Sequence, residues 1–112
     1  MEVFLYLLPL IVALAFPVLL IHAIFWGMTF TADAAYVRVR VYGWTVRKVA
    51  LSDIDWAAQD WVFWNEHWTN TVNPKKLVLL RRRSGVFRNF VISPPSPQEF
   101  LRELAAKGVR VR

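Results

Sequence analysis

The chain opens with its longest apolar run, from Val3 to Trp26, which holds no Asp, Glu, Lys or Arg over 24 residues. As an α-helix this run would be about 36 Å long at ~1.5 Å per residue, which exceeds the roughly 30 Å core of a bilayer. Inside a soluble domain such a helix would need apolar neighbours on every side, and the remaining chain is too short to supply them. The pattern therefore predicts a transmembrane helix over residues 3–28.

A cleaved signal peptide is the alternative interpretation of the same run. Its support is the small-x-small triplet Ala32-Asp33-Ala34, which follows the apolar residues as a cleavage site would. Two features oppose it. The segment before the run, Met1-Glu2, carries no Lys or Arg, and the run is far longer than the roughly 7 to 15 apolar residues of a signal peptide. The sequence thus favours a retained anchor.

Two prolines and a histidine distinguish the predicted helix from a plain apolar span. Pro9 and Pro17 each remove a backbone donor and can bend a helix, which suits either a helix docked on partner helices or an ordinary kinked anchor. His22 lies one turn before Trp26 and is expected at the headgroups or against a neighbouring helix, while a metal or haem ligand is a weaker alternative. Trp26 and Phe30 are expected to mark the membrane interface.

After the helix, strict alternation over residues 36–42 predicts a β-strand with its valines on one face and Arg38 and Arg40 on the other. Residues 44–50 continue the β-prone composition and complete a predicted hairpin, with Trp44, Val46 and Val49 directed inward. Residues 29–35 are interpreted as a juxtamembrane linker, although they could also supply a first strand.

The second half of the chain alternates apolar runs with turn residues. Residues 56–64 fit a further strand, 65–76 a polar loop, and 77–80 with 86–92 a hairpin joined through Ser84-Gly85. Ser96, Pro97 and Glu99 form a capping-box pattern that begins a helix over 97–107. These elements predict a membrane-anchored α+β protein. A single N-terminal helix precedes a small antiparallel β-sandwich or barrel over 36–112, capped by one C-terminal helix.

Several segments of this region resemble the bacterial pleckstrin-homology-like domains that are tethered to one or two membrane helices. The resemblance is carried by Val41-Tyr-Gly-Trp44, Val49-Ala-Leu-Ser-Asp-Ile54, Ser84-Gly85, Val91-Ile-Ser-Pro94 and Pro97-Gln-Glu-Phe-Leu101 with Leu104. It implies a strongly bent sandwich or barrel closed by the terminal helix, and a binding role in place of a reaction. The departure is length, because fewer than eighty residues leave little room for the seven strands of that family.

The distribution of charge predicts the orientation of the chain in the membrane and the candidate binding residues. From Tyr36 onward there are fourteen Lys and Arg against six acids, so the domain should favour anionic surfaces. Lys and Arg near a span stay cytoplasmic as a rule, which predicts an outside N-terminus and a cytoplasmic domain on the inner membrane of a bacterium. The candidate binding residues are the basic side chains of the last hairpin and its base, where each can contribute about 1 kcal/mol near an anionic leaflet. They are Lys75, Lys76, Arg81, Arg82, Arg83 and Arg88. Alternatively, these basic residues determine the orientation of the chain in the membrane and make the domain surface soluble.

No residue pattern in the chain suggests catalysis. There is no cysteine, which excludes disulfides, thiolate metal sites and cysteine nucleophiles, and no glycine-rich phosphate loop. Asp53 and Asp55 suit a turn, and His67 beside Glu66 lacks a nucleophile. We therefore expect no enzyme, metal, cofactor or small-molecule substrate. Nucleic acid is also disfavoured, because the chain is anchored and its aromatics fall at core strand spacing.

Two functions of different classes remain open. The first is a membrane-tethered module that binds a protein partner or anionic lipid headgroups. The second is a structural accessory subunit of a larger membrane complex, with its kinked helix docked on partner helices.

Overall fold

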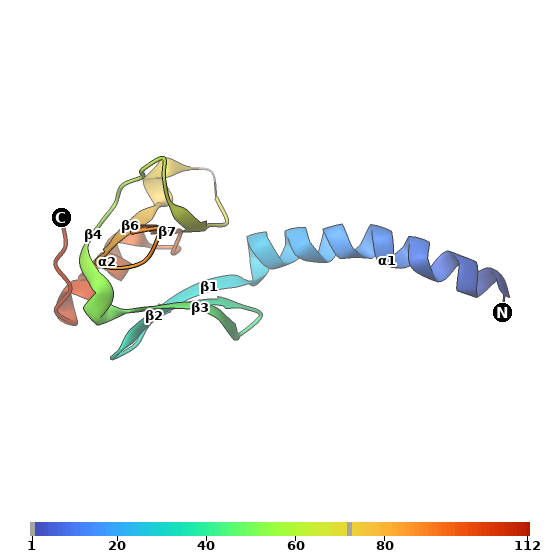
Figure 1. Cartoon of the computed structure of the whole chain (residues 1–112), viewed down its shortest axis with the longest axis horizontal. Helices are drawn as coiled ribbons and strands as arrows, with labels where there is room; N and C mark the ends of the chain where they lie inside the picture. Colours follow the sequence, from blue (N-terminus) through green and yellow to red (C-terminus); the bar gives the residue numbers. More distant parts are fainter. Residues whose placement is uncertain (1, 72) are drawn as a thin grey trace.

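The computed structural model describes residues 2–71 and 73–112 of the chain. A single long helix, α1 (Glu2–His22), projects from a compact domain and continues into the π-helical turn η1 (Ala23–Gly27) (Figure 1). The molecule measures 61 × 27 × 26 Å. Within the described residues this is the one helix long and apolar enough to be a membrane span or a signal sequence.

The helix is exposed along its whole length and touches the domain only at its C-terminal end (Figure 1). Pro9 and Pro17 both lie inside α1, and the helix runs through them without interruption. None of its apolar side chains is buried against the rest of the described chain.

The first sheet is antiparallel, with the order β1 (Met28–Ala32), β2 (Tyr36–Val41), β3 (Trp44–Ala50). The interpretation of residues 29–35 as a linker is wrong, because β1 pairs with β2 from Met28 opposite Val41 to Ala32 opposite Val37. Phe30 is correspondingly buried in the core and not available to lipid, which corrects its prediction as an interface residue. β1 is only five residues long, and Phe30 is the one residue of it that is fully buried, so its strand signal is weak.

The second sheet has the order β4 (Ile54–Ala58), β6 (Val78–Arg82), β7 (Asn89–Ile92), β5 (Glu66–Trp68). The predicted β6–β7 hairpin is confirmed. β5, however, runs parallel to β7, so the sheet is mixed and not antiparallel, and no closed barrel forms in the part of the chain that is described. Short 3₁₀ turns, η2 (Leu51–Asp53) and η3 (Pro74–Lys76), precede β4 and β6.

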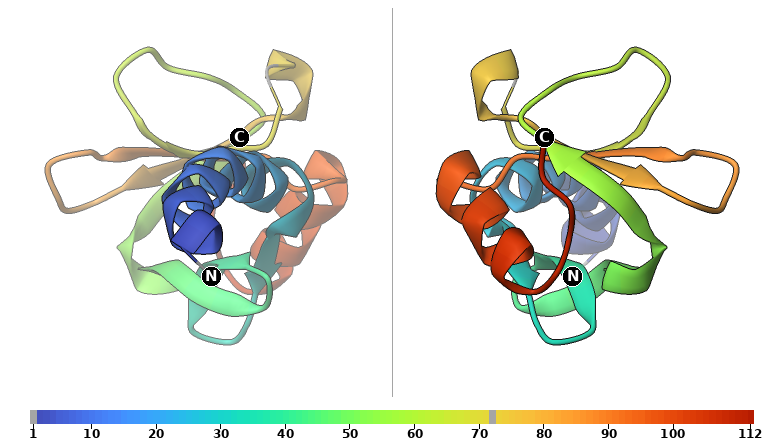
Figure 2. Two further views of the ribbon diagram at one scale, coloured as in Figure 1. Left: turned by 90° about the vertical axis from the view of Figure 1, so that its right-hand side faces the viewer. Right: turned by 90° about the vertical axis from the view of Figure 1, so that its left-hand side faces the viewer.

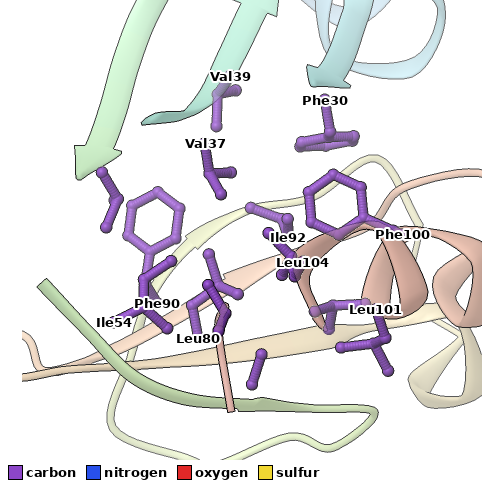
Figure 3. Close-up of a cluster of buried hydrophobic side chains, with 14 residues drawn as sticks. Phe30, Val37, Val39, Ile54, Leu80, Phe90, Ile92, Phe100, Leu101 and Leu104 are labelled. Atoms are coloured by element: carbon purple, nitrogen blue, oxygen red, sulfur yellow. The ribbon is translucent and has the colours of Figure 1, made fainter. Parts of the chain in front are cut away.

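Both sheets and the terminal helix α2 (Pro97–Ala106) share one hydrophobic core (Figure 3). The α+β prediction is thus confirmed at this level. Ser96 is the N-cap residue of α2, although its side chain makes no capping hydrogen bond. The helix is followed by Gly108 at φ 90°, and the C-terminal residues then pair with the edge of β4, where Ala57 N donates to Arg110 O at 2.8 Å (Figure 2).

Candidate membrane-facing surface

The basic residues expected to form one patch are divided between two sides of the domain. Lys75 and Lys76 lie in η3 at the start of β6, whereas Arg81, Arg82 and Arg83 lie at its end. A five-residue strand is roughly 16 Å long at ~3.3 Å per residue. Figure 2 shows η3 and the β6–β7 turn at opposite sides of the molecule. The predicted single patch is therefore wrong.

Two of these arginines are engaged inside the domain. Arg82 Nε donates to Asp53 Oδ2 at 2.9 Å, and its side chain is only 14% exposed. Arg81 donates to Asn89 Oδ1 at 2.9 Å. Arg83 and Arg88 are the exposed cations of the β6–β7 turn. The sequence could not show this division, because Asp53 lies 29 residues before Arg82.

A different group of residues gathers where the helix meets the domain. Tyr42, in the β2–β3 turn, donates its backbone N–H to Gly27 O at 2.9 Å. Its hydroxyl is hydrogen-bonded to His22 Nδ1, and the two rings stack with centroids 5.7 Å apart. His22 stacks in turn on Trp26 at 5.5 Å. The histidine therefore has an aromatic partner in its own chain, twenty residues away, which sequence reasoning missed.

The β2–β3 turn has the backbone that such a close contact requires. Tyr42 has φ 51° and Gly43 φ 85°, and two positive φ values are typical of a tight two-residue hairpin turn. A left-handed conformation costs a non-glycine residue about 1 kcal/mol or more. The contacts of Tyr42 with Gly27 and His22 offset this cost, so the turn is held at the end of the helix.

We expect Gly27→Ala to separate the β2–β3 turn from the end of the helix, because a Cβ at residue 27 would lie 2.8 Å from Tyr42 Cε1. The ring would have to move, weakening the Tyr42 N–H···O bond to Gly27. Hydrogen exchange of the Tyr42 amide should accelerate about tenfold, which corresponds to ~1.4 kcal/mol of lost protection. Thr29→Ala, at an exposed position two residues further on, is the matched control and should leave that rate unchanged. Equal exchange rates of the Tyr42 amide in both variants would contradict the close contact between Tyr42 and Gly27.

The same end of the domain carries exposed aromatic side chains. Trp26 is 72% exposed, Tyr42 54% and Trp44 79%. The prediction that Trp44 and Val46 point inward is wrong, because the β2–β3 turn extends beyond the core. The pairing also passes from Val39–Arg47 to Arg40–Thr45 and leaves Val46 out as a bulge. Trp and Tyr are the residues enriched at membrane interfaces.

Arginine and lysine side chains lie on the outer face of the first sheet, farther from the helix than the aromatic edge formed by Trp26, Tyr42 and Trp44. Arg38 pairs with Asp33 at 2.6 Å, and this bond, with backbone N–H donors, holds the pKa of Asp33 well below its usual range. The Lys48 ammonium lies 4.5 Å from the Tyr36 ring centroid. Among the described residues Arg40 has no carboxylate within 4.0 Å, and its buried Nε has no hydrogen-bond partner.

The remaining candidate pair, His67 and Glu66, does not form an acid–base couple. The Glu66 carboxylate accepts from Arg47 Nε at 2.8 Å and from Trp68 Nε1 at 2.8 Å. The hydrogen bond from Arg47 is the main reason that the pKa of Glu66 lies below its ordinary value. Glu66 therefore ties β5 to β3.

Comparison with protein families, with curated proteins and with solved structures found no match for this chain. The likeness to pleckstrin-homology-like domains therefore stays a prediction. Function has to be inferred from the surfaces described above, of which the aromatic edge formed by Trp26, Tyr42 and Trp44 is the most clearly tied to the helix.

Proposed function

We propose that this chain is a single-pass membrane protein whose domain is a non-catalytic, pleckstrin-homology-like binding module resting on the anionic leaflet at the end of its own anchor. The observation that carries the proposal is the hydrogen bond from Tyr42 N to Gly27 O. It holds the β2–β3 turn beside the last turn of the apolar helix. Once α1 spans a bilayer, the exposed rings of Tyr42 and Trp44 lie at the depth of the headgroups.

Arg40 supplies the electrostatic part of this contact. It lies two residues before Tyr42, about 7 Å along the strand, and is therefore within one Debye length of the headgroups at physiological salt. An arginine this close to an anionic leaflet contributes about 1 kcal/mol. The basic composition of the domain supports its placement on the cytoplasmic side of a bacterial inner membrane.

The contact is tested by site-specific labelling of the full chain in vesicles, which is straightforward because the chain has no native cysteine. A fluorophore on Thr45→Cys should be quenched by brominated lipids. One on Val86→Cys, which is 86% exposed in the β6–β7 turn, should not. A Thr45 label that is never quenched, in neutral or in anionic vesicles, would overturn the proposal.

Arg40→Gln should weaken the response to anionic lipid by about fivefold in the ratio of docked to undocked domain, since ~1 kcal/mol is lost. The readout is quenching of the Thr45 label in vesicles with and without phosphatidylglycerol. Lys76→Gln, an exposed cation in η3, is the charge-matched control and should behave like the wild type. If both variants lost the response equally, net charge and not the position of Arg40 would determine docking.

The accessory-subunit function is favoured by a separate observation. No residue of α1 is buried within the chain, and Pro9 and Pro17 would suit a helix packed on partner helices. Partner subunits would then cover both the helix and a side of the domain.

A further inference from the structure

A row of three polar side chains crosses the outer face of the first sheet near the end of the helix. Thr29 of β1 is the strand partner of Arg40 in β2, and Arg40 is the partner of Thr45 in β3. Phe30 and Val39, the adjacent residues of β1 and β2, are buried in the core, so the row points away from the second sheet (Figure 1). Opposed residues have Cβ atoms about 5 Å apart, so a threonine lies on each side of the arginine. These three residues are here called the Thr–Arg–Thr row.

Arg40 has no acceptor for its guanidinium in the described part of the chain. No carboxylate lies within 4.0 Å of it, and its buried Nε has no hydrogen-bond partner. Buried N–H groups in native proteins are almost always paired, so an acceptor from outside the domain is expected here. Thr29 and Thr45 are exposed, and each adds a hydroxyl donor beside the arginine. The row therefore presents one positive charge and several donors to an anion.

The charges around the row leave it positive. Residues 28–50, all of which the structure describes, contain one acid, Asp33, and it pairs with Arg38 at 2.6 Å. Lys48, the strand partner of Arg38, has no carboxylate within 4.0 Å among the described residues, and its ammonium lies 4.5 Å from the Tyr36 ring centroid. A headgroup that carries an ammonium finds no unpaired carboxylate on these strands. The row therefore favours a headgroup whose charge is only negative.

The row lies at the depth of the phospholipid phosphates when α1 spans a bilayer. With Trp26 at the boundary of the hydrocarbon core, Thr29 lies two residues of β1 beyond Gly27, or ~7 Å at ~3.4 Å per residue. The headgroup layer is roughly 5–8 Å thick on each side of the core. Arg40 lies at the same level as Thr29, and its long side chain can extend toward the headgroups. Lipid phosphates are therefore the anions closest to the row.

From these observations we propose that the Thr–Arg–Thr row binds the phosphodiester group of an anionic phospholipid of the phosphatidylglycerol class. The terminal amino groups of Arg40 donate to the phosphate oxygens, and the hydroxyls of Thr29 and Thr45 donate to the same group. The inference rests on the proposed function and deepens it. A general attraction between a basic domain and the leaflet becomes a site for one lipid molecule with defined donors.

The test is native mass spectrometry of the full chain, released from detergent micelles that contain equal amounts of phosphatidylglycerol and phosphatidylcholine with the same acyl chains. The wild type should retain a single phosphatidylglycerol molecule in preference to phosphatidylcholine. Retention of the two lipids in equal amounts would overturn the proposal.

Arg40→Lys separates a phosphate site from attraction by charge, because it keeps the positive charge and loses the planar fork of donors. It should lower the ratio of retained phosphatidylglycerol to phosphatidylcholine at least ~5-fold. Thr29→Val with Thr45→Val removes both hydroxyls at constant charge, in residues that suit a strand equally well, and should lower the ratio about tenfold. Thr31→Val is the matched control, because Thr31 is exposed on the same face of β1, and it should keep the wild-type ratio.

A wild-type ratio in Arg40→Lys and in the double threonine variant would overturn the phosphate site and leave Arg40 with the long-range attraction of the proposed function. Glycerol phosphate, a headgroup without acyl chains, should not be retained from micelles of phosphatidylcholine alone. Its retention there would assign the row to a soluble phosphate ester and overturn the lipid proposal. The proposed function fails by a different result, a Thr45 label that brominated lipids never quench in vesicles.

Discussion

Replacing Phe90 by alanine is expected to lower the free energy of unfolding by about 3–5 kcal/mol, the range found when a buried aromatic ring is removed from a core. Phe90 is 0% exposed and lies between the two sheets, facing Val37 and Ile54 (Figure 3). The Arg47 guanidinium also lies 5.5 Å from its ring centroid. Removal therefore leaves a cavity where both sheets meet.

The measurement is denaturant unfolding of the full chain in detergent micelles, followed by tryptophan fluorescence. Phe63→Ala is the matched control, because its ring is 83% exposed, and we expect a change within about 0.5 kcal/mol. If Phe90→Ala does not fold, Ile92→Val removes one methyl group from the same core and should cost about 0.5–1.5 kcal/mol. A larger loss from Phe63→Ala than from either core variant would contradict this assignment of the core.

The elements that the sequence predicted well are those whose signals are local. The uncharged run of α1, the alternation of β2 and the Ser84-Gly85 turn each lie within one short segment. β5 could not be predicted in this way, because Glu66–Trp68 has only three residues, two of them polar, and its strand depends on parallel pairing with β7 more than twenty residues later. Parallel pairing across such a distance leaves no mark on the local pattern.

The candidate site illustrates a second limit of prediction from the sequence. Consecutive residues of a strand point to opposite faces, so Arg81 and Arg82 of β6 do not share one face. The contact between His22 and Tyr42 was also beyond sequence reasoning. It depends on a turn with positive φ returning the chain to the end of the helix. What the sequence did predict next to the apolar run was an interface position for Trp26, which is 72% exposed at the end of the helix.

Removing the Asp53 carboxylate should destabilise the domain by about 2–3 kcal/mol. Its two oxygens accept from Arg82 Nε at 2.9 Å and from Ser84 Oγ at 2.7 Å, so Asp53→Ala leaves a largely buried guanidinium unpaired. Loss of one partner from a fully buried ion pair destabilises a protein by about 3–5 kcal/mol. The side chains of Arg82 and Asp53 are 14% and 19% exposed, so the expected loss of stability is somewhat smaller. Asp55→Ala is the control. Its 3.8 Å contact with Arg83 is exposed, and its loss should cost less than about 0.5 kcal/mol.

The effect of Asp53→Ala should also depend on pH. Burial alone would raise the pKa of Asp53, but the hydrogen bonds from Ser84 and Arg82 outweigh it and hold the pKa below its ordinary value. A carboxyl whose pKa is lowered by folding stabilises the protein above the unfolded pKa of about 3.9, and this contribution is lost as the pH falls through the folded pKa. The difference in unfolding free energy between wild type and Asp53→Ala should therefore be full at pH 7 and shrink below pH ~4. A difference that stayed constant down to pH 2 would mean that the charge of Asp53 contributes nothing, and that the variant acts only through lost packing.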